Sequence, residues 1–188
     1  METGPLPTAV NFGGDGEAVS LVMGGDVLFH SYLIHGGKQA DGSYDYDYAF
    51  QYLQSITSEV DIAIANMEGT LAGEPYTGFP LFSAPDAVAK AIRSGGFNVA
   101  LSSNNHMIDK GAAGLKRTVD ILESEGLVVS GTRRSEDEPF YQLVDVGGIR
   151  VAMATFTYET IRQEGRRALN AIVIPDEAVG LVNSFSME

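Results

Sequence analysis

Short apolar runs, rich in β-branched residues, alternate along the chain with segments of helical spacing. Each run stops at a turn that contains glycine or polar residues, which is typical of buried strands. The runs lie at Ala18–Gly24, Asp61–Ala65, Phe97–Leu101 and Leu127–Ser130. Because strands of this kind alternate with helices in parallel sheets that are covered on both faces, the pattern predicts a largely parallel sheet.

Three segments between the apolar runs have the one-sided apolar spacing of helices. Tyr46–Val60 is the first, and its apolar positions are Tyr48, Ala49, Tyr52, Leu53 and Ile56. The second runs from Pro85 to Arg93, since proline suits the first position of a helix. The third is Ala112–Glu125, which Gly126 ends.

A β-hairpin is predicted after the last of these helices and strands. Phe140–Val146 and Ile149–Phe156 are two strand-like runs separated only by Gly147 and Gly148, a two-residue loop that favours a hairpin. The predicted fold class is therefore α/β, with a mostly parallel sheet flanked by helices and a C-terminal β-hairpin.

Composition sets the domain organisation. The chain has 188 residues, of which 44% are hydrophobic and 20% charged, so it can bury a core of its own as one domain. Residues 1–17 are rich in glycine and proline and contain no apolar stretch of the signal-peptide kind, so we expect a flexible leader outside the fold. Residues 18–188 form the predicted domain.

Charge and cysteine content exclude several function classes. The formal net charge of −13 repels phosphate backbones, so nucleic acid is not an expected partner. The chain has no cysteine, which excludes disulfides, thiolate metal ligands and cysteine nucleophiles.

Polar side chains follow three consecutive strands, where the strands end. They are Asp26 after the first run, Asn66 and Glu68 after the second, and Asn104, Asn105 and His106 after the third. Parallel sheets bind ligands beyond the carboxyl ends of their strands. Carboxylate, amide and imidazole groups are ligands of hard or borderline divalent cations, so the sequence predicts a metal site at this edge.

Other residues near these strand ends have more than one interpretation. His106 is a candidate metal ligand or proton donor, and Asp109 either orients that imidazole or caps the next helix. His30 either lines the same edge or makes only local hydrogen bonds, and His35 is expected in a surface turn. Asn66, Asn104 and Tyr158, the last of them just after a strand, are candidate substrate contacts.

Three segments resemble the bacterial capsule synthesis protein family of the CapA type. They are Gly25–His30 (GDVLFH), Asp61–Glu68 (DIAIANME) and Ser103–Gly111 (SNNHMIDKG), supported by Phe82–Pro85, Gly95–Val99 and Gly147–Ala152. The resemblance implies poly-γ-glutamate capsule biosynthesis. It also implies a fold similar to part of the four-layer α/β/β/α sandwich of the calcineurin-like metallophosphoesterases.

The resemblance also implies roles for individual residues. Asp26 would bind a first divalent cation, Glu68 would bridge two cations and Asn105 would bind the second. His30 matches a histidine of many relatives and is a further candidate ligand, while His106 would protonate a leaving group or hold an oxyanion. The cations could be Mn, Zn, Fe or Mg.

Two functions of different classes remain open. One is a metal-dependent hydrolase or transferase acting at a phosphoryl or acyl centre during capsule synthesis. The other is a non-catalytic factor that binds envelope polymer and assists assembly. A plain intracellular nucleotidase or phosphoesterase is a third and weaker alternative. The resemblance implies an anionic polymer or its precursor and other membrane proteins of capsule synthesis as partners. It also implies an extracytoplasmic, membrane-anchored full-length protein.

The family's later metal-ligand segments, His-Trp-Gly-x-Glu and Gly-x-His-Pro-His, have no counterpart, since no histidine follows His106. We therefore expect the N-terminal part of a longer domain, with a weak and inactive metal site when alone. A parallel sheet that is only partly built exposes an edge strand, so we also expect self-association through that edge.

Overall fold

The computed structural model describes residues 8–161, 165–169 and 172–186. The helices are α1 (Ser31–Gly36), α2 (Gln54–Thr57), α3 (Ala87–Ser94) and α4 (Gly111–Ser124), with short 3-10 turns at Asp47–Ala49 and Asp176–Ala178. The strands are β1 (Val10–Gly13), β2 (Leu21–Leu28), β3 (Ile62–Glu68), β4 (Val99–Leu101), β5 (Val128–Ser130), β6 (Gln142–Val146), β7 (Ile149–Met153), β8 (Thr157–Ile161), β9 (Arg167–Leu169), β10 (Ile172–Val173) and β11 (Ser184–Ser186).

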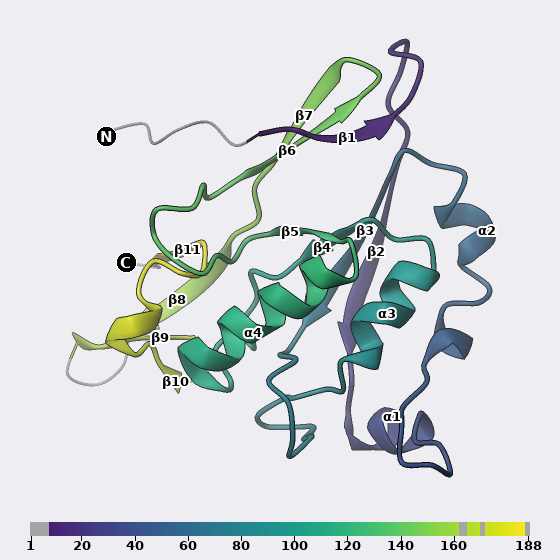
Figure 1. The fold of residues 1–188 in the computed structure, drawn as a ribbon. Coiled ribbons are helices and arrows are strands. Elements are labelled where there is room, and N and C mark those ends of the chain that lie inside the picture. The colour runs from purple at the N-terminus through teal and green to yellow at the C-terminus, as the bar shows by residue number, and fades with distance from the viewer. Residues whose placement is uncertain (1–7, 162–164, 170–171, 187–188) are drawn as a thin grey trace.

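The central sheet is parallel and has the strand order β2-β3-β4-β5 (Figure 1). All four apolar runs predicted as strands contribute to it, and its order follows the chain. The predicted fold class is therefore confirmed. Parallel order brings every carboxyl end to the same edge of the sheet, and α1 follows β2 at the lower end of Figure 1.

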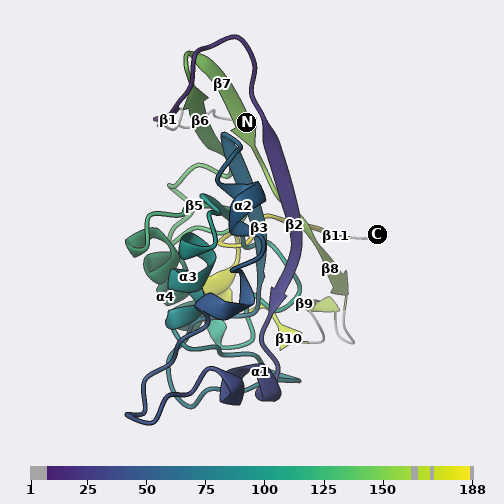
Figure 2. The same ribbon diagram turned by 90° about the vertical axis from the view of Figure 1, so that its right-hand side faces the viewer.

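The two faces of the central sheet have different covers. Ala63 and Ala65 of β3 belong to a core cluster with residues of α3 and α4, whereas Ile62 and Ile64 pack in a second cluster with residues of β6. This division follows from the alternation of side chains along a strand. Helices thus flank one face, and the sheet β1-β6-β7 covers part of the other. Figure 2 shows α3 and α4 on one side of β2 and β3, with β8 on the other.

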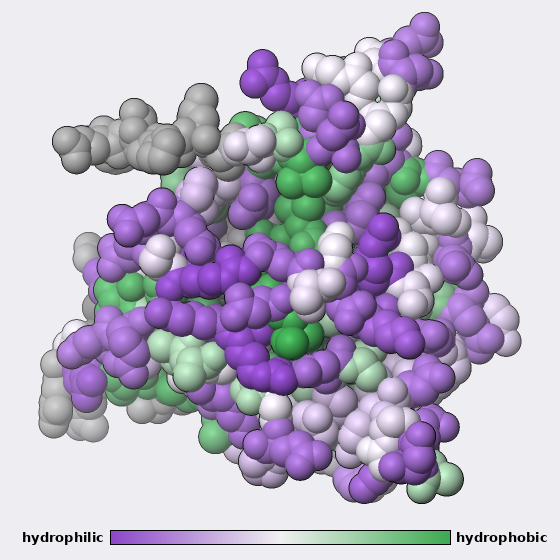
Figure 3. All heavy atoms as spheres, in the orientation of Figure 1, coloured by the Kyte–Doolittle hydropathy of each residue, from purple (hydrophilic) through white to green (hydrophobic). Residues whose placement is uncertain are grey.

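Helices α3 and α4 bury one side each, as the spacing predicts. Val88 and Ile92 of α3 and Leu115 and Leu122 of α4 are fully buried, and all four face the first core cluster. The outer side of the molecule that carries these helices is mostly hydrophilic (Figure 3). Their stability therefore depends on the sheet beneath them, because short helices gain most of it from packing.

The predicted hairpin is present. Strands β6 and β7 pair antiparallel, with Val146 opposite Ile149. Gly147 and Gly148 form the turn at φ +58° and +93°, values that only glycine adopts without strain.

A third small sheet follows the hairpin, with the order β10-β9-β8-β11. The sequence pattern predicts the hairpin as the C-terminal element, because these four strands of two to five residues are too short to give a periodic signal. None of the helices in the described ranges is long and apolar enough to cross a membrane.

Part of the stretch expected to lie outside the fold is a strand. Val10–Gly13 forms β1, which pairs parallel with β6 and places Val10 opposite Val144. Pairing satisfies the backbone groups on the outer edge of β6, which the hairpin alone would leave open. Residues 1–7 of the same stretch lie outside the described residues.

The prediction of one helix over Tyr46–Val60 is wrong. Only the 3-10 turn and the four residues of α2 are helical there, and the predicted stripe is largely in solvent: Tyr52 is 84% exposed and Ile56 55%. Tyr46 and Phe50 are buried instead. The Tyr46 hydroxyl donates to the Ile34 carbonyl (3.0 Å) and its ring packs on Phe29, so tertiary contacts override the periodic pattern.

This difference can be tested by two alanine substitutions. Leu115→Ala should lower the free energy of unfolding by about 2–5 kcal/mol, because it leaves a cavity between α4 and the sheet. Ile56→Ala should change it by less than about 0.5 kcal/mol, because that side chain lies in solvent. Urea unfolding measures both changes. Equal losses of free energy would indicate that Ile56 is buried, as the predicted helix requires, and would contradict the described structure.

Candidate functional site

Strands β2 and β3 bring the first three predicted site residues together. Both strands run further than the sequence pattern indicated, so Asp26 and Glu68 lie inside them rather than in the turns that follow. An extra residue in β2 between Met23 and Asp26 brings Asp26 beside Asn66. The Asn66 side-chain amide then donates to Asp26 Oδ1 at 2.7 Å.

The loop after β4 is tied to the end of β3. The Asn104 side-chain amide donates to the Met67 carbonyl at 2.8 Å. Asn104 Oδ1 accepts the backbone N–H of His106 at 3.1 Å. Asn104 is buried, and the nitrogen and the oxygen of its side-chain amide both make hydrogen bonds within the protein. Asn104 therefore holds the backbone of His106 in place. The structure therefore gives Asn104 a supporting place beside the carboxylates.

His106 is held from one side by a buried carboxylate. Its Nδ1 lies 2.9 Å from Asp109 Oδ2, and the same oxygen accepts the backbone N–H of Phe82 at 2.8 Å. Helix α4 has Lys110 at its N-cap and no side-chain capping bond. Of the two interpretations of Asp109, the geometry therefore favours orientation of the imidazole. The other ring nitrogen, Nε2, lies 3.9 Å from Glu68 Oε1.

The surroundings of Glu68 and Asp109 change the pKa values of both carboxyl groups. Burial raises the pKa of Glu68, the adjacent Asp26 carboxylate raises it further, and His106 opposes both. Burial also raises the pKa of Asp109, against the hydrogen bonds from Phe82 and His106. Asp109 Oδ1 is buried and accepts no hydrogen bond from any described residue. Burial thus disfavours the charged forms of both Glu68 and Asp109.

His30 and His35 lie close in sequence but in different surroundings. His30 is exposed at the N-cap of α1, and its ring lies edge-to-face on Phe82 with centroids 4.9 Å apart. His35 is exposed in the last turn of α1, with Nδ1 2.6 Å from the Ser31 carbonyl. His35 thus lies at the surface as expected, although in a helix, while His30 shares an aromatic neighbour with His106.

The other candidates differ in how they relate to this cluster. Asn105 is half-buried between Asn104 and His106, and its side chain makes no hydrogen bond within the described ranges. Tyr158 lies on β8, where its ring contacts Phe185 (centroids 4.6 Å apart) rather than any of the strand-end residues. Sequence reasoning gave no separate role to Phe82, whose only signal was its place in the Phe82–Pro85 segment.

The donor set is suited to a hard divalent cation, but it is short of ligands. Asp26, Glu68 and Asn105 offer oxygen atoms, which such cations prefer. Within the ranges that the structure describes, no three His, Asp or Glu side chains are grouped so as to hold a metal ion. Since a cation takes about four to eight ligands, these residues can supply part of a coordination shell.

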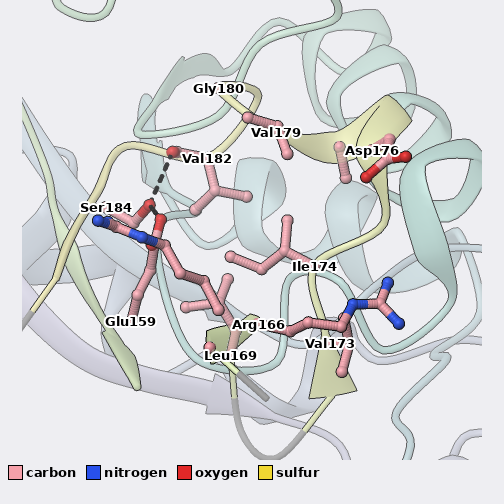
Figure 4. A pocket seen from close by; sticks show the side chains of 13 residues that line it. Glu159, Arg166, Leu169, Val173, Ile174, Asp176, Val179, Gly180, Val182 and Ser184 are labelled. Atoms are coloured by element: carbon pink, nitrogen blue, oxygen red, sulfur yellow. Dashed lines mark hydrogen bonds and ion pairs between the residues drawn. The ribbon is translucent and has the colours of Figure 1, made fainter. Parts of the chain in front are cut away.

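A cavity of about 330 Å³ lies elsewhere, between β8 and the 3-10 turn at Asp176–Ala178 (Figure 4). Apolar side chains, among them Ile174 and Val182, form much of its wall. Glu159 at its edge is already paired with Arg167 (3.1 Å). None of the strand-end residues lines this cavity. The candidate site is therefore separate from the cavity and lies at the carboxyl ends of the parallel strands.

Comparison with known proteins points to one family. The family model described as bacterial capsule synthesis protein PGA_cap matches residues 20–179. The capsule biosynthesis protein CapA of Bacillus anthracis is 27% identical over 150 residues. That match covers 76% of this chain and 36% of the relative, so the chain spans little more than a third of that protein's length.

The burial of Glu68 and its repulsion from Asp26 predict a pH dependence in metal-free protein. Because the pKa of Glu68 is raised in the folded state, the stability that this carboxyl contributes is present at low pH and is lost as the pH rises through the raised value. Glu68→Gln removes the ionisation. Its free energy of unfolding, relative to the unsubstituted chain, should therefore increase from about pH 4 to about pH 7.

Urea unfolding in chelator at several pH values measures this difference, with Glu59→Gln as the control for an exposed glutamate. The control should show no such trend. A Glu68→Gln advantage that stays constant or shrinks with rising pH would contradict the described electrostatics.

Proposed function

Because this chain belongs to the bacterial capsule synthesis protein family, we propose that it works in making an envelope polymer through a divalent-cation site at the strand ends. The observation that carries the proposal is the acidic pair Asp26 and Glu68, set at the carboxyl edge of a parallel sheet beside His106. A carboxylate whose pKa is raised by burial and by a neighbouring carboxylate, as that of Glu68 is, would be stabilised by a bound cation, which replaces repulsion with attraction.

Asp26, Glu68 and Asn105 would hold the cation, with His30 as a further candidate ligand. Their donor chemistry suits Mn, Zn, Fe or Mg, and the family resemblance favours two ions. Such a cation supplies Lewis-acid polarisation of an anionic oxygen. Because the described residues do not fill a coordination shell, we propose that ligands from further polypeptide complete it.

His106 is the residue that we assign to proton transfer. Asp109 accepts from Nδ1, and Nε2 lies on the side of Glu68, 3.9 Å from its Oε1, where it would hold or deliver a proton at a substrate oxygen. The buried carboxylate of Asp109 behind the ring orients the imidazole for this role. The geometry suits hydrolysis or transfer at a phosphoryl or acyl centre.

For the substrate we propose an anionic envelope polymer such as poly-γ-glutamate, or its precursor. A chain with net charge −13 repels such a molecule unless cations at the site reverse the local field. Asn66, Asn104 and Tyr158 remain candidate contacts. The same proposal places the protein outside the cytoplasm, beside membrane proteins of capsule synthesis. Self-association is a separate proposal, which rests on β2 being an edge strand of the central sheet.

A second candidate function is a non-catalytic assembly factor that binds polymer. It is favoured by the incomplete grouping of acidic and histidine side chains in the described residues. Polymer binding that persists in Asp26→Ala and Glu68→Ala, without turnover of any phosphoester or acyl substrate, would identify this function.

Calorimetric titration of Mn²⁺ and Zn²⁺ tests the proposed cation site. We expect weak binding to the unsubstituted chain and a loss of at least about tenfold in affinity in Glu68→Ala, because that carboxylate faces both Asp26 and His106. Glu59→Ala, which removes an exposed glutamate, should bind as the unsubstituted chain does.

Affinity unchanged by Glu68→Ala would contradict the site, and so would equal losses in Glu68→Ala and Glu59→Ala. The same titration on a longer chain that includes the family's later ligand segments should give much tighter binding, since a fuller shell would surround the cation.

A further inference from the structure

One buried aromatic ring contacts two of the protein's three histidines. Phe82 is 3% exposed, and its ring lies edge-to-face on His30 (centroids 4.9 Å apart, 88° between planes) and on His106 (4.6 Å, 82°). The two histidines come from different segments, one after β2 and the other after β4. Phe82 is therefore the shared neighbour of both imidazoles.

The backbone of Phe82 is fixed as firmly as its ring. Its N–H donates to Asp109 Oδ2, the same oxygen that contacts His106. Its carbonyl accepts the Thr70 hydroxyl at 2.7 Å. A shift of Phe82 would therefore affect His106 in two ways, through the contact between the rings and through the hydrogen bond to Asp109.

Two glycines of the loop that carries Phe82 lie close to neighbouring atoms. A Cβ on Gly69, which has φ +102°, would lie 3.0 Å from the Cβ of Phe82. A Cβ on Gly78 would lie 2.8 Å from both the backbone nitrogen and the hydroxyl of Ser31, the residue next to His30. The loop is thus closely packed around Phe82 at Gly69 and against the start of α1 at Gly78.

We propose that Phe82 is a positioning residue that holds the imidazoles of His30 and His106 in one arrangement at the strand-end carboxylates. Edge-to-face contacts restrict the rotation of each imidazole ring. The hydrogen bond from the Phe82 N–H to Asp109 fixes the position of the phenyl ring relative to His106. The link to cation binding rests on the proposed function, whereas the orientation of the rings does not.

The three histidines make this proposal measurable by NMR. In the unsubstituted chain, nuclear Overhauser contacts should join the Phe82 ring protons to the imidazole protons of His30 and His106. Phe82→Leu should shift both imidazole signals, which lose the ring current, and should lower the order parameters of both rings. The His35 signal should stay in place because its ring contacts the Ser31 carbonyl and not Phe82.

Two further variants separate positioning from general loss of packing. Phe97→Leu removes another buried phenyl ring, which packs on Phe50 rather than on a histidine, and should leave all three imidazole signals unchanged. Phe82→Tyr keeps the ring and should restore the signals and order of both histidines. Absent Overhauser contacts in the unsubstituted chain, or unchanged imidazole order in Phe82→Leu, would overturn the proposal.

Cation affinity provides the second readout. Where the unsubstituted chain binds Mn²⁺, Phe82→Leu should lose about 10–100-fold in affinity and Phe82→Tyr and Phe97→Leu should not, as expected for residues that support ligands. Unchanged affinity in Phe82→Leu would overturn the link to the site. If the unsubstituted chain binds no Mn²⁺, the proposed cation site fails, and the NMR signals still decide whether Phe82 orients the imidazoles.

Discussion

The candidate site depends on the hydrogen bonds that the buried carboxylate of Asp109 accepts. This carboxylate accepts hydrogen bonds from the backbone of Phe82 and from the His106 imidazole, so it joins the loop over residues 69–84 to the segment after β4. Burial of a carboxylate is unfavourable, as its raised pKa indicates, and the two hydrogen bonds to one oxygen offset part of that cost. The second oxygen receives no bond from the described residues.

The parallel sheet supplies the other half of the arrangement. Its register puts Asp26 beside Asn66 and brings Glu68 to the same edge, and the loop after β4 delivers His106 to them. Two acidic groups thus meet an imidazole that is already oriented from behind. Burial and the Asp26 carboxylate both disfavour the charged form of Glu68, and a bound cation would offset that repulsion, which is why we propose a cation site there.

Much of this was accessible from the sequence because local signals agreed with the fold. The apolar runs that form β2 to β5 are bounded by turn residues, and Gly147 and Gly148 marked the hairpin. The strand-end rule then grouped Asp26, Glu68 and His106 without any side-chain geometry. Those signals depend on nearest neighbours along the chain, and tertiary structure here reinforces them.

The remainder depends on contacts between segments far apart in the sequence. The aromatic stripe of Tyr46–Val60 has helical spacing, but Tyr46 gains more by reaching the Ile34 carbonyl than by joining a helix. Strand β1 exists because β6 offers an open edge, which no local pattern announces. The role of Phe82 follows from its contacts with two histidines that lie 24 and 52 residues away in the chain.

The most direct test of a cation site at the strand ends is X-ray diffraction from crystals grown with Mn²⁺, recorded where manganese scatters anomalously. A cation site there should give an anomalous peak in contact with the carboxylates of Asp26 and Glu68 and the side chain of Asn105. Crystals that show manganese only on exposed carboxylates elsewhere, with these three residues arranged as described here and no peak between them, would contradict it.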